Sequence, residues 1–139
     1  MKSVVLMAAL VALPMAADAR NMEDLMTVNT LSGERQEFEV LNHPGAGPAM
    51  FWCAAGAYAF HELGLGPNKR VYLVQGRAPS VTRSGWTAVT FTTDPTHPVV
   101  AQLPDGGRGD LVLSLSKKGY ALSVDSARQY CFDGPDIIP

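Results

Sequence analysis

The sequence predicts an α+β domain in which one buried helix packs on an antiparallel sheet of about four to five strands. Three observations indicate this fold class. Residues 49–63 have strong helix propensity, and most of the remaining apolar stretches have the short, alternating or β-branched character of strands. The chain also holds two cysteines, Cys53 and Cys131, which predict one disulfide between the helix and the end of the sheet.

The first residues are typical of a secretory signal peptide. Lys2 precedes a short apolar run, and Ala17-Asp18-Ala19 gives the small-x-small pattern of a cleavage site. We expect residues 1–19 to be removed after Ala19, which places the protein in the periplasm or outside the cell. A retained N-terminal anchor is the alternative. Residues 20–139 are then expected to form a single small α+β domain without a further membrane segment.

The first strand is expected shortly after the start of this domain. Residues 20–33 have no sustained hydrophobic period, which predicts an irregular entry segment. Phe38 and Val40 then alternate with Glu37 and Glu39. This alternation is typical of a strand that has one face in the core and the other in water.

Residues 49–63 form the one long helix that the sequence predicts. The stretch contains no β-branched residue and no charged residue before Glu62, and Pro48 stands at the first helical position, where a missing N–H costs nothing. Gly64, Gly66 and Pro67 end the helix. The helix is apolar nearly all round, so we expect it to be buried or covered by a partner.

The second half of the domain is expected to consist mainly of strands. Residues 70–76 suit a central strand, and residues 86–93 are β-branched and aromatic. Residues 111–115 and 120–124 each place apolar side chains at alternate positions, and the turn between them ends in glycine, which predicts a β-hairpin. Asp125 is a candidate N-cap for a short helical turn that brings Cys131 back to the core.

Cys53 has two interpretations. In an exported chain an even number of cysteines predicts a disulfide, here Cys53–Cys131. Alternatively, a cysteine near a helix N-terminus has a lowered thiol pKa and suits a nucleophile. Over about fifteen residues the stretch PAMFWCAAGAYAFHELGLG resembles papain-like cysteine peptidases of the NlpC/P60 and CHAP kind, which implies a hydrolase acting on cell-envelope peptides. However, His97 lies between two prolines, and His61 is two turns along the same helix, out of reach of the sulfur.

A binding function is indicated by basic residues and by a long loop. The candidate anion-binding residues are Lys69, Arg70, Arg77 and Arg83, which flank the strand at 70–76 and the loop after it. A basic rim of this kind suits a carboxylate or phosphate, although such residues are more often only solvated. The long loop at residues 94–110 suits a lid or a recognition loop.

Other function classes have little support in the sequence. The net charge of −2 argues against nucleic acid as a partner, and the chain has no phosphate loop, serine elbow or Cys-x-x-Cys pair. The histidines and methionines lack the spacing of a metal site, and no cofactor is expected. We therefore expect a non-catalytic binding or accessory protein for an unknown protein or small anionic ligand, with the papain-like hydrolase as the alternative.

Overall fold

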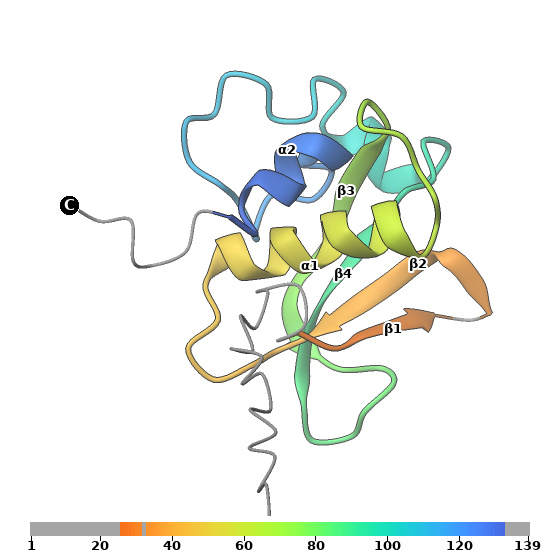
Figure 1. The fold of residues 1–139 in the computed structure, drawn as a ribbon, viewed down its shortest axis with the longest axis vertical. Helices are drawn as coiled ribbons and strands as arrows, with labels where there is room; N and C mark the ends of the chain where they lie inside the picture. Colours follow the sequence, from red (N-terminus) through yellow and green to blue (C-terminus); the bar gives the residue numbers. More distant parts are fainter. Residues whose placement is uncertain (1–25, 32, 133–139) are drawn as a thin grey trace, which may run out of the picture.

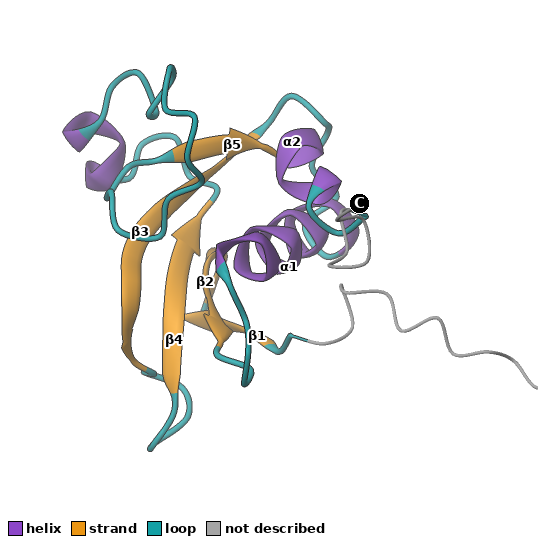
Figure 2. Cartoon of the chain, turned by 90° about the vertical axis from the view of Figure 1, so that its left-hand side faces the viewer, coloured by secondary structure: helices purple, strands orange, loops and turns teal. Residues whose placement is uncertain are grey.

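The computed structural model describes residues 26–31 and 33–132, so the expected signal peptide lies outside the described residues. Five strands form one antiparallel sheet in the order β1-β2-β4-β3-β5. Helices α1 and α2 lie on one face of this sheet, as Figures 1 and 2 show. The elements in chain order are β1 (Val28–Leu31), β2 (Glu34–Leu41), α1 (Pro48–His61), β3 (Arg70–Pro79), β4 (Thr87–Thr92), the short 3-10 helix η2 (Pro98–Gln102), β5 (Ala121–Ser123) and α2 (Val124–Gln129). The predicted α+β class is confirmed.

The core lies between α1 and the central strands. Leu73 on β3 pairs with Phe91 on β4, which pairs in turn with Phe38 on β2, and all three side chains are fully buried. Trp52 of α1 packs its ring edge-on against Phe91, with ring centroids 4.9 Å apart. Its indole N–H donates to the carbonyl of Ser114 at 2.9 Å, which satisfies the one polar atom of this buried side chain.

Helix α1 begins with Pro48 at its first turn, as the sequence predicts, and every residue from Phe51 to Ala57 is buried. The sheet covers one side of α1 and α2 covers another (Figure 2). Gly56 allows this approach, because a Cβ atom built on it would lie 2.7 Å from the Cβ atom of Ala127 on α2. The predicted burial of a helix that is apolar nearly all round is therefore confirmed.

The predicted disulfide is confirmed. Cys53 in the middle of α1 is bonded to Cys131, which lies 78 positions later in the chain. The two Cα atoms are 4.9 Å apart, and Cys131 follows directly after α2. In the chain-entropy description a bridge that closes a loop of this length stabilises the fold by on the order of 4 kcal/mol.

The hairpin predicted for residues 111–115 and 120–124 is wrong. Residues 111–115 form no strand, and the side chains of Leu111 and Val112 are 100% and 77% exposed. The chain bends instead, because the hydroxyl of Ser114 accepts the backbone N–H groups of Ser116 and Lys117. The following residues, Ala121–Ser123, pair with β3 as the edge strand β5.

Three further differences concern one strand that was not expected and the ends of two other elements. Residues 28–31 were expected to be irregular but form β1, which pairs with β2. Strand β3 continues beyond residue 76 to Pro79. Helix α2 is capped by Ser123, whose hydroxyl accepts the N–H of Ser126 at 3.1 Å, and Asp125 lies inside its first turn.

Candidate functional site

The four predicted anion-binding residues occupy two separate places. Lys69 and Arg70 stand at the start of β3, whereas Arg77 lies near its other end, roughly 20 Å away at about 3.3 Å per residue. Arg77 donates to the carbonyl of Ala46 at 3.0 Å. Arg83 lies beyond the end of β3, with its guanidinium 3.8 Å above the ring of Trp86. The structure therefore brings together Lys69 and Arg70 only.

A groove of about 360 Å³ runs beside Lys69 and Arg70, and we call it the Lys69 groove. Its described lining contains amide, hydroxyl and cationic groups and no carboxylate; the residues are Gln36, Leu65, Asn68, Lys69, Arg70, Tyr72, Thr93 and Pro95. Backbone hydrogen bonds hold its walls in place. Thr93 N–H donates to the carbonyl of Gln36 at 2.9 Å, and Val124 N–H donates to the carbonyl of Lys69 at 2.7 Å.

The carboxylates nearest in sequence to this groove have other partners. Glu37 lies 3.5 Å from Nε2 of His97. Asp94 accepts hydrogen bonds from the hydroxyl and the backbone N–H of Thr96, at 2.7 and 2.8 Å. These hydrogen bonds hold the pKa of Asp94 below its ordinary value. The positive charges of Lys69 and Arg70 are thus left without a carboxylate among the lining residues of the Lys69 groove.

A second cleft, of about 250 Å³, lies on the other side of Arg70, and we call it the Arg70 cleft. Two cationic side chains, Arg70 and Arg108, and two carboxylates, Asp105 and Asp110, line it. Gly106 lies against Arg70, since a Cβ atom there would be 3.4 Å from Nη1, in ordinary van der Waals contact. The two hollows therefore share Arg70.

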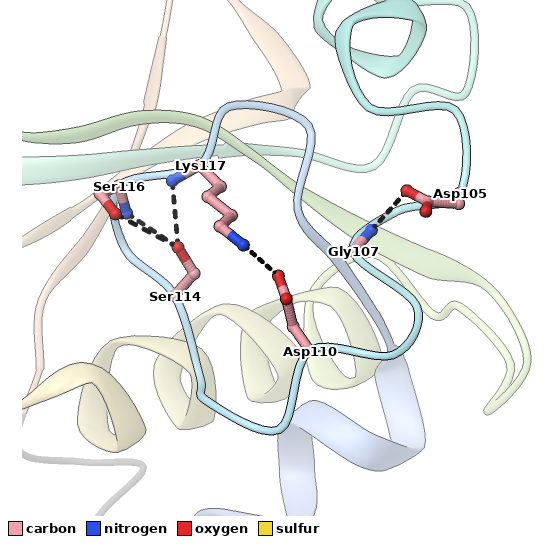
Figure 3. A network of polar contacts seen from close by, with 6 residues as sticks. All are labelled: Asp105, Gly107, Asp110, Ser114, Ser116 and Lys117. Atoms are coloured by element: carbon pink, nitrogen blue, oxygen red, sulfur yellow. Dashed lines mark hydrogen bonds and ion pairs between the residues drawn. The ribbon is translucent and has the colours of Figure 1, made fainter.

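The loop that forms the wall of the Arg70 cleft is held by its own polar contacts, which Figure 3 shows. Asp105 accepts the N–H of Gly107 at 3.1 Å, and Asp110 forms an ion pair with Lys117 at 2.5 Å. The N–H of Ala121 on β5 donates to the carbonyl of Gly106 at 2.9 Å, which covers the outer edge of β5. These contacts favour a fixed wall over the lid that the long loop at 94–110 suggested.

Tyr120 forms the inner part of the Arg70 cleft. Burial raises the pKa of its hydroxyl, and the nearby Tyr130 and Asp110 raise it further, so the group stays protonated at neutral pH. Gly107 packs directly on the ring, since a Cβ atom there would lie 2.6 Å from a ring carbon. A neutral hydroxyl, two guanidinium groups and two carboxylates thus line the same small cleft.

The region of Cys53 does not form a comparable site. Cys53 is fully buried, and its sulfur is bonded to Cys131, so no thiolate is available there. His97 caps η2, with its Nδ1 accepting the N–H of Val99 at 3.1 Å. Within residues 26–31 and 33–132, no three His, Cys, Asp or Glu side chains are grouped as metal ligands. No helix in this part of the chain is long and apolar enough to cross a bilayer.

Comparison with known proteins gives no relative on which to base a function. The chain matches no protein-family model, no curated protein and no solved structure. The resemblance of the Cys53 segment to papain-like peptidases therefore depends on those residues alone.

The sequence did not indicate that Arg108 belongs to this site. Arg108 is 38 positions from Arg70 in the chain, within a glycine-rich stretch whose backbone path has no periodic signal. The glycines themselves were the available clue, because Gly106, Gly107 and Gly109 all have positive φ angles. A run of such residues indicates a tightly turned loop but does not show which strand it approaches.

Proposed function

We propose that this protein is exported and acts without catalysis, as an accessory protein that binds a small anionic ligand beside Arg70. One observation carries the proposal: Lys69, Arg70 and Arg108 converge on two adjoining hollows from different parts of the chain. Guanidinium groups bind carboxylates and phosphates through paired, charge-assisted hydrogen bonds. A ligand with one such group would therefore bind Arg70 together with Lys69 in the groove, or together with Arg108 in the cleft.

The local charges favour an anion over a cation. Of the two carboxylates that line the cleft, Asp110 is already paired with Lys117, and Asp105 accepts a backbone N–H of its own loop. Arg70 is partly buried, so its charge is screened by water less than that of a fully exposed arginine. An incoming carboxylate or phosphate would thus meet Lys69 and Arg70 in the groove, or Arg70 and Arg108 in the cleft, where Asp110 is already paired with Lys117.

The size of the hollows suits a small ligand. The groove, at about 360 Å³, lies at the lower end of the range for small-molecule sites, and the cleft, at about 250 Å³, lies slightly below it. Gln36 and Asn68 can donate or accept hydrogen bonds from the body of such a ligand, and Leu65 and Pro95 provide apolar contact. We expect an organic acid or a phosphorylated metabolite in preference to a polymer.

Export is supported by two independent features. The apolar N-terminal run with its Ala17-Asp18-Ala19 pattern is typical of a cleaved signal, and disulfides such as Cys53–Cys131 persist in oxidising compartments. Expression of the full chain in a bacterial host, followed by fractionation and mass measurement, tests this part. We expect a periplasmic protein that begins at Arg20 and contains the bridge. An uncut chain with two free thiols in the cytoplasm would contradict it.

The papain-like hydrolase alternative loses its support because Cys53 has no free thiol. A cysteine nucleophile attacks as the thiolate, and the sulfur of Cys53 is already part of a disulfide.

Thermal-shift measurements on residues 20–139 test the ligand proposal. The protein is titrated with phosphate, acetate, citrate and glutamate at constant ionic strength, with chloride as the reference anion. We expect at least one of these anions to raise the melting temperature in a saturable way, and Arg70→Gln to abolish that rise. Arg83→Gln is the matched control, because Arg83 lies outside both hollows. A rise that survives Arg70→Gln, or no saturable rise with any anion, would contradict the proposal.

A further inference from the structure

The turn between β3 and β4, residues 80–86, is an exposed surface that we call the β3–β4 tip. Figure 1 shows this turn at the bottom of the molecule, on the side away from α2. The tip lies beyond the end of β3, and Arg70 stands at the start of that strand. It is therefore separate from the proposed anion site, and an inference about it does not depend on that proposal.

The tip is fixed by a buried carboxylate. Glu39 of β2 is only 1% exposed, although its alternation with Phe38 predicted a position in water. Its carboxylate accepts hydrogen bonds from the hydroxyl of Ser80 at 2.5 Å, the N–H of Val81 at 3.1 Å and the N–H of Thr82 at 2.9 Å, and also from the hydroxyl of Thr82. Three consecutive residues of the tip are thus attached to one side chain of a neighbouring strand.

Further hydrogen bonds complete the order of the tip. The side-chain amide of Asn29 on β1 donates to the hydroxyl of Thr82 at 2.9 Å. Within the tip, the N–H of Arg83 donates to the hydroxyl of Ser80 at 2.9 Å, and the N–H of Trp86 donates to the carbonyl of Arg83 at 3.2 Å. A surface turn that is ordered in advance loses little conformational entropy when it binds a partner.

This fixed turn presents apolar and cationic groups to solvent. Val81 is 80% exposed and Trp86 is 40% exposed. The guanidinium of Arg83 stacks 3.8 Å above the ring of Trp86. Tryptophan and arginine are the residue types most enriched at the energetic centres of protein interfaces. Exposure of an ordered Val-Arg-Trp group therefore indicates a recognition surface.

The positive charge near the tip favours a partner with an acidic group. Residues 70–93 contain no Asp or Glu, and neither do residues 40–61. Glu39 directly precedes the second of these stretches, but its carboxylate is buried and accepts hydrogen bonds from the tip. Arg83 thus gives this surface a positive charge next to its apolar side chains.

We propose that the β3–β4 tip docks a protein partner whose binding segment places an acidic residue beside a large apolar residue. The acidic group would pair with Arg83, and the apolar side chain would pack against Val81 and Trp86. An anionic lipid surface is the competing occupant. We favour a protein, because a turn held by hydrogen bonds to Glu39 presents a fixed arrangement of groups, which suits a partner of defined shape.

Selection from a random 12-residue phage-displayed peptide library on residues 20–139 tests this proposal, with counter-selection on Arg83→Gln/Trp86→Ala. We expect enriched peptides that carry Asp or Glu next to Leu, Phe or Trp. Their affinity should fall at least tenfold in Arg83→Gln and in Trp86→Ala, and should decrease with added salt. Arg70→Gln is the control and should bind these peptides like the unchanged protein, while circular dichroism confirms that each variant is folded.

Three results would overturn the proposal. The first is a selection that yields no acidic and apolar peptides. The second is peptide binding that survives Arg83→Gln in a folded protein. The third is sedimentation of the unchanged protein with vesicles of phosphatidylglycerol, but not with phosphatidylcholine, that is lost in Trp86→Ala; this result would assign the tip to a membrane surface.

Discussion

Gly56 of α1 faces Ala127 of α2 so closely that a Cβ atom on Gly56 would lie 2.7 Å from that of Ala127 and 3.0 Å from the backbone nitrogen of Arg128. The Cys53–Cys131 bridge lies about one helical turn away along α1. Close packing and a covalent bond thus join the two helices at neighbouring points. This junction explains why α1 is apolar on more than the side that faces the sheet.

Gly56→Ala should destabilise the protein despite the better helix propensity of alanine. Alanine gains up to about 1 kcal/mol in a helix interior, but overpacking against backbone costs about 1 to 3 kcal/mol. We expect a net loss of free energy of unfolding of about 1 to 2 kcal/mol in urea denaturation. Ala127→Gly in the same chain should recover part of this loss, because it removes the nearest atom. A Gly56→Ala protein that is as stable as the unchanged one would contradict this account of the junction.

Loss of the disulfide should destabilise the domain strongly. Paired replacement Cys53→Ala and Cys131→Ala removes the bridge without leaving a free thiol, and we expect the melting temperature to fall by more than about 10 °C. Mass measurement of the unchanged protein before and after reduction checks that the disulfide is present, since reduction of one bridge adds two hydrogens. Two alkylatable thiols in the protein as purified from the periplasm would contradict the bridge.

The stability of the β3–β4 tip should depend on pH through Glu39. Burial alone would raise the pKa of this carboxyl, but hydrogen bonds from Ser80, Thr82 and Val81 outweigh burial and lower the pKa below its ordinary value of 4.5. Because the folded pKa is the lower one, Glu39 stabilises the folded state fully above about pH 4.5, and this contribution disappears as the pH falls through the folded pKa.

Glu39→Gln tests this relationship. The variant keeps the shape of the side chain but cannot accept as many hydrogen bonds, so we expect it to be less stable by about 1 to 3 kcal/mol at neutral pH. Its unfolding free energy should also decrease less between pH 5 and the acid range, roughly pH 3, than that of the unchanged protein. Glu37→Gln is a control on the same strand. Identical pH profiles for Glu39→Gln and the unchanged protein would contradict the proposed role.

Much of the fold could be predicted because the residues that favour a helix locally also form the apolar surface that packs in the core. Proline at the start and glycines after the end of α1 mark the helix, and its apolar surface predicts burial on several sides. The cysteine pairing followed from there being only two cysteines in the chain. The residues around Leu111 show the limit of periodicity. Alternate leucines resemble a strand, but the Ser114 hydroxyl turns the backbone and only Leu115 of that series is buried.

The candidate site could be predicted only in part. Lys69 and Arg70 are neighbours in sequence and share a groove, whereas Arg77 is separated from them by the length of β3. The approach of Arg108 depends on the path of a glycine-rich loop, which no sequence pattern determines. The buried state of Glu39 also depends on a distant turn, because the donors that make its burial tolerable are supplied by residues 80–82.

An NMR titration of ¹⁵N-labelled residues 20–139, with the anion that gives the largest thermal shift, tests the anion site at Arg70 most directly. We predict saturable shifts of the backbone amides of Lys69, Arg70, Gly106 and Arg108, and the loss of these shifts in Arg70→Gln. The amides of the β3–β4 tip should not move. Shifts that are spread evenly over the basic residues, or that concentrate at Arg77 and Arg83, would contradict an anion site at Arg70.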